Sequence, residues 1–139
     1  MRKLKRFGVS MDDTLLKKFD KLISEKGYKN RSEAIRDFIR ENLVSEEWKK
    51  EKGEKIGTVT IVYNHHKRGL SDKLNDVQHK MAKNIVSTTH IHLDHDNCLE
   101  VIIVKGEVKK ITHLVDTLIG LKGVKHGKFV MTTTGKDLV

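Results

Sequence analysis

The sequence predicts an α+β protein made of two modules, and three patterns along its 139 residues support this. The first is a short alternating segment at residues 3–11, which two amphipathic helical segments follow. The second is a change of composition after residue 50, because all eight histidines and the single cysteine lie beyond it. The third is a βαββαβ order of predicted elements from residue 56 onward, which is the ferredoxin-like arrangement of helices on one face of an antiparallel sheet.

Positive charge is the strongest signal in the composition. The chain has 28 Lys and Arg against 19 Asp and Glu, and its net charge of +9 favours an anionic partner such as nucleic acid. No stretch approaches the roughly 18 uninterrupted apolar residues of a membrane helix, and no apolar segment of a signal peptide follows the basic N-terminus. A single cysteine excludes an internal disulfide framework, so we expect a cytoplasmic protein with no membrane partner.

The first module reads as a strand and two helices. Its alternating segment places apolar side chains on one face and Arg6, Gly8 and Ser10 on the other. An amphipathic helix follows and ends at Gly27, and Asn30 caps a second one. The charged run from residue 45 to residue 55 is the predicted boundary with the second module.

A strand with two helices is too small to be stable alone, and a lone strand leaves both of its edges unpaired. Pairing with the same strand of a second chain would form an antiparallel ribbon, which fits the DNA major groove. The ribbon would present its polar face twice, with Lys3 and Lys5 nearby. The start of the second helix, Asn30–Arg31–Ser32, is a predicted phosphate site through its free N–H groups. The alternative is a helical hairpin with a solvated basic tail.

The stretch NRSEAIR at residues 30–36 resembles the opening of the second helix in ribbon-helix-helix DNA-binding repressors. This resemblance implies that Arg6, Gly8 and Ser10 read base edges in a double-stranded DNA operator. Gly8 departs from the family pattern, in which a hydrogen-bonding residue such as threonine is usual. Glycine offers no side chain to a base, so the resemblance implies no specificity from this position.

The second module is predicted to contain four strands and two helices. In chain order these are the strand Ile56–Asn64, the helix Leu70–Ile85, the strands Val86–Leu93 and Cys98–Val104, the helix Glu107–Leu121 and the strand Val124–Thr134.

Candidate metal ligands gather around the turn between the two middle strands. His90 and His92 are two residues apart on a strand and share a face, and Cys98 begins the next strand across a short turn. Imidazole and thiolate together are a donor set for transition metals. The alternatives are a polar strand face and a cysteine buried as a small hydrophobic residue.

Successive side chains of a strand point to opposite faces, so position along the strand predicts which face carries these ligands. The residues of opposite parity on the two strands are apolar: Ile91, Leu93, Leu99, Val101 and Ile103. We expect this apolar face to meet the chain's own helices, which would leave the candidate ligands on the uncovered face. His79 lies about 180° around its helix from Leu70 and so faces away from its own sheet. We therefore expect His79 to reach the sheet of another chain, so that a metal would join subunits.

The spacing H-x10-H-x-H-x5-C, made by His79, His90, His92 and Cys98, resembles the nickel-responsive transcriptional regulators. The stretches IVSTTHIHLDHDNCLEVIIVKG and GVKHGK are also similar to that family, so the resemblance covers essentially the whole chain. It implies that four planar donors bind Ni(II) at the interface of a tetrameric core, with His79 supplied by a neighbouring subunit. Square-planar geometry suits Ni(II) or Cu(II) better than Zn(II), which is tetrahedral in structural sites.

The resemblance also implies a domain plan and an assembly. Residues 1–48 would be a ribbon-helix-helix DNA-binding domain, residues 49–55 a linker, and residues 56–139 an ACT-like domain for nickel binding and tetramerisation. The assembly would be a homotetramer, a dimer of dimers with a DNA-binding pair at either end.

Other titratable residues carry weaker predictions. Glu33 and Asp37 lie one helical turn apart and could hold a second cation, as in the secondary site of that family, or could pair with Arg36 and Arg40. The remaining histidines are predicted to lie on the surface, where some could bind excess metal loosely: His65, His66, His95, His113 and His126.

The leading hypothesis is a cytoplasmic Ni(II)-responsive repressor of nickel uptake or related metal genes, in which the metal is coupled to DNA binding. The alternative is a ribbon-helix-helix regulator whose ACT-like domain binds a small organic effector such as an amino acid. A metal-dependent enzyme ranks last. Catalysis needs an open coordination position or a paired acid and base, and a saturated set of four protein ligands offers neither.

Overall fold

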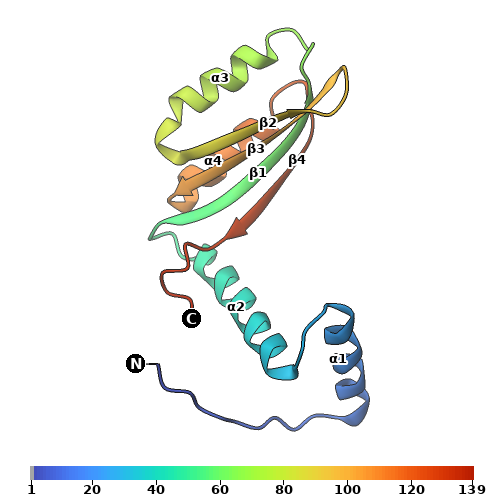
Figure 1. The fold of residues 1–139 in the computed structure, drawn as a ribbon. Coiled ribbons are helices and arrows are strands. Elements are labelled where there is room, and N and C mark those ends of the chain that lie inside the picture. The colour runs from blue at the N-terminus through green and yellow to red at the C-terminus, as the bar shows by residue number, and fades with distance from the viewer. Residues whose placement is uncertain (1) are drawn as a thin grey trace. The chain divides into compact units, whose positions relative to one another are not determined.

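The computed structural model describes residues 2–139, which form two compact units, one up to Glu41 and the other Asn42–Val139. Met1, at which the first predicted domain begins, lies outside the described residues. The elements labelled in Figure 1 are the helices α1 (Asp13–Glu25), α2 (Arg31–Lys49), α3 (Leu70–Lys80) and α4 (Val108–Ile119), and the strands β1 (Lys55–Asn64), β2 (Ile85–His92), β3 (Asn97–Gly106) and β4 (Val124–Thr132). Because α2 runs through the division between the units, the predicted domain boundaries stay a prediction.

Helix α1 ends where Gly27 predicts, and α2 begins at its predicted cap Asn30. Asp12 caps α1, since its Oδ1 accepts the backbone N–H of Thr14 at 2.8 Å. Gly27 follows α1 with a φ of 82°, a conformation that glycine adopts without strain. Asn30 Oδ1 accepts the N–H of Glu33 at 2.8 Å, so Asn30 caps α2 as its sequence position predicts.

The strand predicted at residues 3–11 is absent from the single chain. Leu4 is 95% exposed and Phe7 is 73% exposed, and the segment makes no strand pairing (Figure 1). The physical reason is that a lone strand has no ladder partner within its own unit.

The first unit has a small core. Ile23 and Ala34 are buried, and the ring of Phe38 packs edge-on against Phe19 and Tyr28, with centroids 6.0 and 6.3 Å apart. Other apolar side chains of the two helices are about half exposed, namely Leu15, Leu22 and Ile39. Burying such surface is worth roughly 25 cal/mol per Å², so this unit would gain stability from a partner.

The second unit is a four-stranded antiparallel sheet in the order β2-β3-β1-β4, with α3 and α4 side by side. This confirms the predicted βαββαβ architecture. Helix α3 ends at Lys80 rather than at Ile85, and a short 3-10 turn, Ala82–Asn84, leads into β2. Met81 and Ile85 still pack against the core from outside the helix, which is why the apolar periodicity extends past its end.

The prediction that the helices cover the sheet face opposite the candidate ligands is wrong. Cys98, Ile102 and Val104 on β3 are fully buried and share one core with the apolar residues of α3 and α4. The helices therefore cover the face that carries Cys98, and the opposite face, with Ile91 47% exposed, is the uncovered one. Both faces of β3 are apolar, so alternation alone could not decide between them.

The sequence of strand β1 indicates which face of the sheet the helices cover. Its residues Val59 and Ile61 are fully buried, whereas Thr58 and Thr60 on the other face are only partly buried. Because β1 pairs with β3, with Val59 opposite Ile102, the polar threonines mark the uncovered face of both strands.

Among residues 2–139, no helix is long and apolar enough to cross a bilayer.

Candidate metal centre

A tight turn positions the predicted ligands at one end of the sheet. Asp94 Oδ1 accepts the backbone N–H groups of Asp96 and Asn97 at 2.9 and 2.8 Å. The Asn97 side-chain amide also donates to both carboxylate oxygens of Asp94. These bonds stabilise the charged carboxylate and lower the pKa of Asp94 to about 2, the bond from the Asn97 side chain being the largest cause. The turn thereby holds His92 directly opposite Cys98.

The turn predicts a pH dependence of stability. The folded-state pKa of Asp94 is about 2 and its usual value is 3.8, so the stabilisation is complete above about pH 4. It is lost as the pH falls through 2, when the carboxylate is protonated. We expect Asp94→Ala to lower the free energy of unfolding at pH 6 and to flatten its fall between pH 4 and pH 2. Denaturant unfolding at several pH values measures both, and an unchanged acid profile would contradict this account of the turn.

Three of the four predicted nickel ligands lie close together. The Cys98 Sγ atom lies 3.3 Å from the Nδ1 atom of His92, and the rings of His90 and His92 have centroids 5.1 Å apart. Metal–nitrogen and metal–sulfur bonds of about 2.0 and 2.3 Å separate two adjacent donors by about 3.1 Å at a right angle and about 3.5 Å at a tetrahedral angle. The observed separation lies in this range, so His92 and Cys98 can bind one ion without a large rearrangement.

Burial controls the protonation of the thiol. Cys98 has no exposed surface, and its burial, followed by the nearby Asp94 and Glu100 carboxylates, raises the pKa of the thiol. A bound cation would displace this proton, since the thiolate is the form that ligates metals.

His79 lies apart from this cluster, as its helical position predicts. Its side chain is exposed, whereas Leu70 and Leu74 on the same helix are buried. Within residues 2–139, His79 belongs to neither of the two groups of side chains whose donor atoms come within 4.8 Å of one another. Donation of His79 to a neighbouring chain stays a prediction.

His65 joins the cluster, which corrects its prediction as a surface residue. It is partly buried, and its Nδ1 atom lies 3.4 Å from Cys98 Sγ. Burial, and then His66 and His92, lower the pKa of His65 and so favour its neutral, ligating form. The strand register contains the missed signal, because Tyr63 pairs with Cys98 and His65 follows two residues later.

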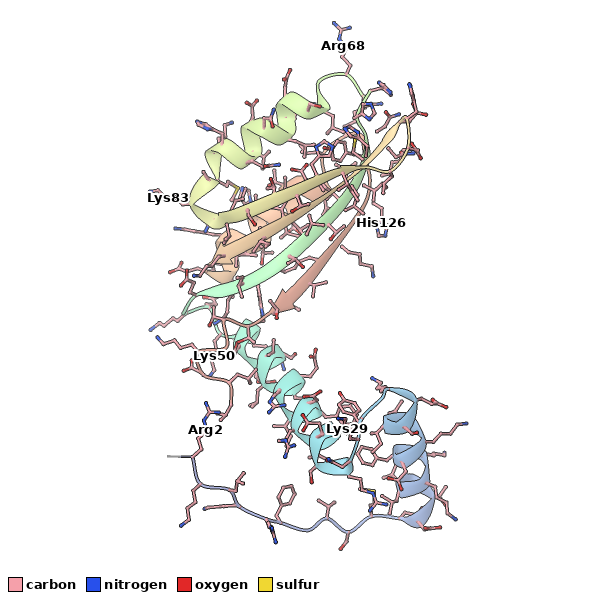
Figure 2. The ribbon with its side chains drawn as sticks, viewed as in Figure 1. Arg2, Lys29, Lys50, Arg68, Lys83 and His126 are labelled. Carbon is pink, nitrogen blue, oxygen red and sulfur yellow. The ribbon has the colours of Figure 1, made fainter. Side chains whose placement is uncertain are left out.

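The other histidines are exposed, as predicted. His66 and His95 both approach Asp96, with His66 Nε2 3.5 Å and His95 Nδ1 3.2 Å from Asp96 Oδ1. His113 lies on α4. His126 lies on β4 (Figure 2).

A buried carboxylate links the ligand strands to α3. Glu100 is 7% exposed, and it accepts hydrogen bonds from Gln78 Nε2 at 2.9 Å and from the Tyr63 hydroxyl at 3.3 Å. Gln78 precedes His79 on α3, and Glu100 pairs with His90 across the sheet. Burial, then Glu100 and Cys98, raise the pKa of Tyr63, so its hydroxyl stays protonated and can donate. This network was not predicted from the sequence.

The predicted second cation site contains ion pairs instead. Arg36 pairs with Glu33, and Arg40 Nη1 lies 2.9 Å from Asp37 Oδ1. The Tyr28 hydroxyl donates to the other oxygen of Asp37 at 2.8 Å, and this bond is the first cause of a lowered pKa for that carboxyl. In the described chain these contacts favour the pairing alternative over a cation site.

The predicted DNA-contacting residues of the first unit are exposed, as that role requires: Lys3, Lys5, Arg6, Gly8, Ser10, Asn30, Arg31 and Ser32. Arg31 is engaged within its own unit, because its Nε and Nη2 each donate to Asp20 at 2.8 Å. The phosphate site at the start of α2 would therefore depend on the backbone N–H groups and not on this guanidinium.

A basic segment and two helices, followed by an α+β domain with an imidazole–thiolate cluster, match the plan expected of a metal-responsive DNA-binding regulator. The family model described as "NikR C terminal nickel binding domain" matches residues 56–132, and that of "Ribbon-helix-helix protein, copG family" matches residues 5–46. The chain belongs to the nickel-responsive regulator family, which is a family of transcription regulators and not of enzymes.

Curated relatives match along nearly the whole chain and carry the provisional name nickel-responsive regulator. A protein of Geotalea uraniireducens is 59% identical over 96% of both chains. One of Thermococcus onnurineus is 54% identical over 99% of both. Among solved structures, an uncharacterized Thermotoga maritima protein covers 58% of this chain and 100% of its own, with a TM-score of 0.52 and 17% identity, which is a likeness of fold. The ACT domain of a Chlorobium tepidum GTP pyrophosphokinase gives a TM-score of 0.47 at 22% identity, over 56% of this chain and 100% of its own.

Proposed function

We propose that this protein is a cytoplasmic repressor that binds its DNA operator in response to Ni(II) and controls nickel uptake or related metal genes. The proposed ligands are His79, His90, His92 and Cys98. The observation that carries the proposal is the 3.3 Å separation of Cys98 Sγ and His92 Nδ1 at the end of a sheet in a chain of this family. The single cysteine fits a reducing compartment, in which a thiolate ligand stays available.

Bound Ni(II) would supply a rigid planar link between donors that otherwise lie on separate elements. His90, His92 and Cys98 would hold the ion from β2 and β3. Glu100 would hold α3 in place through Gln78, the neighbour of His79, and so fix the position from which His79 is presented.

The proposed assembly is a homotetramer, a dimer of dimers. Two observations support it. His79 is exposed and lies outside its own chain's cluster. The segment of residues 3–11 has no strand partner, and its apolar side chains are exposed. Pairing of the N-terminal segments would form one interface, and the metal would join the other. The paired segments would then present Arg6 and Ser10 twice to a double-stranded operator.

The DNA-binding proposal predicts different effects for two basic residues. Arg6→Ala should cost roughly 1–3 kcal/mol on a preferred duplex if Arg6 contacts a guanine through two hydrogen bonds. Lys3→Ala should weaken binding to preferred and random duplexes alike. It should also reduce the slope of log affinity against log salt concentration by about one, as the loss of one phosphate contact does.

Fluorescence anisotropy of the nickel-loaded protein, with a duplex selected from a random pool and a scrambled control, measures these effects. Equal losses on both duplexes for Arg6→Ala would make Arg6 a phosphate contact and would contradict its role in reading bases.

A further inference from the structure

The C-terminal end of α2 belongs to the core of the second unit. Trp48, in the last turn of α2, is 8% exposed, and its indole N–H donates to the backbone carbonyl of Thr132 on β4 at 2.8 Å. The indole ring also packs edge-on against Phe129 of β4, with centroids 5.5 Å apart. Val44, one helical turn earlier, packs against the same core. The end of α2 is therefore fixed to the sheet by apolar packing and by one hydrogen bond.

The backbone of β1 leaves room for the Phe129 ring. A Cβ atom added to Gly57 of β1 would lie 2.7 Å from this ring and 2.7 Å from the backbone oxygen of Val130. Both contacts would be too short, so glycine at this position lets Phe129 lie against β1 and support Trp48. The anchor of α2 thus involves the paired strands β1 and β4 and not a surface contact alone.

One helix takes part in two cores. Near its start Ala34 is buried in the first unit, and near its end Trp48 is buried in the second. Residues 41–43, at the division between the units, are exposed. Residues 49–55, the predicted linker, come after Trp48 and lie within the second unit. Helix α2 itself is therefore the connection along the chain between the DNA-binding segment and the sheet.

We propose that Trp48 is a positioning residue for the nickel response, because it makes α2 follow any movement of the sheet. This inference rests on the proposed function, in which nickel joins the sheets of neighbouring subunits. A metal that fixes those sheets would also fix the ends of the α2 helices attached to them. A helix can transmit this constraint along its length, because its backbone hydrogen bonds make it a rigid element. Without the anchor, nickel would still bind but DNA binding would not respond to it.

The test separates nickel binding from the response of DNA binding in the full-length protein. The response is the ratio of affinities for a labelled duplex selected from a random pool, with and without saturating Ni(II), measured by fluorescence anisotropy. Trp48→Ala should bring this ratio, about 5–150-fold in ordinary allosteric systems, close to one. It should leave the nickel–thiolate band, the Ni(II) affinity and the affinity for a scrambled duplex unchanged. Trp48→Phe keeps a ring against Phe129 but loses the N–H donor, so its response should be intermediate.

A second pair of variants tests the role of α2 without altering the core of the second unit, and it decides the question if Trp48→Ala fails to fold. Glu41→Gly weakens the helix at an exposed position, whereas Glu41→Ala places a strong helix former there. Both remove the same charge, and only the glycine variant should lose the response. Trp48 is the single tryptophan, so its fluorescence should be that of a buried indole that acrylamide quenches poorly.

A normal nickel response in Trp48→Ala would overturn this inference alone, and so would an equal response of the two Glu41 variants or ready quenching of Trp48. A lowered Ni(II) affinity in Trp48→Ala would make Trp48 a support of the metal site and would also overturn the inference. Equal affinity of the unsubstituted protein for the selected duplex with and without Ni(II) would instead overturn the proposed function.

Discussion

Cys98→Ala is expected to abolish the nickel–thiolate absorption band and to weaken Ni(II) binding by more than about 100-fold, beyond the 10–100-fold typical of residues that only support a ligand. The physical reason is the loss of the single thiolate in the chain. The fold should persist, because removing one buried sulfur atom costs about 1 kcal/mol, by analogy with other small deletions in cores, against a total of about 5–15 kcal/mol.

Nickel titration followed by absorption measures the effect, and thermal unfolding of the metal-free variant checks the fold. His113→Ala is the matched control, since it removes an exposed imidazole of α4. A Cys98→Ala protein that binds Ni(II) as tightly as the unsubstituted chain would contradict the assignment of the ligands.

Metal binding should also weaken as the medium is acidified. The imidazoles must be neutral and the thiol must lose its proton, and burial already raises the pKa of Cys98. Affinity should therefore fall as the pH is lowered, because protons compete with the metal for these donor atoms.

The second large effect is complementation between two variants that each lack a nickel ligand. His79→Ala and Cys98→Ala assemblies should each lack a complete four-ligand site. When the two are refolded together, a Cys98→Ala subunit still carries His79 and can complete the His90, His92 and Cys98 set of a His79→Ala neighbour. A fraction of the nickel band should therefore return in the mixture.

Donation within one chain would give a different result, because every chain in the mixture lacks a ligand of its own. Each variant alone is the control, and exchange of labelled subunits shows that mixing has occurred. No return of the band despite proven mixing would exclude donation of His79 between subunits.

The order of elements and the ligand cluster could be predicted because local patterns decide them. Capping by Asn30 and the positive φ of Gly27 fix helix ends through contacts only a few residues apart. The two-residue spacing of His90 and His92, with Cys98 across a tight turn, brings the ligands together whichever face they occupy. That part of the site needed no knowledge of tertiary packing.

The features that sequence missed depend on contacts between distant segments. Which face of the sheet the helices cover follows from β1, where Thr58 and Thr60 mark the uncovered side, and not from the ligand strands. His65 reaches Cys98 only because β1 pairs with β3 in one particular register. The strand predicted at residues 3–11 does not form because the single chain offers it no ladder partner.

The central claim is that nickel occupancy controls operator binding. The most direct test titrates Ni(II) into one sample and follows two signals, the thiolate absorption band and the binding of a labelled duplex selected from a random pool. The account predicts that affinity for the selected duplex rises together with the band, that both saturate at about one nickel per chain, and that a scrambled duplex gains much less. Equal affinity for the selected duplex in metal-free and nickel-saturated protein would contradict it.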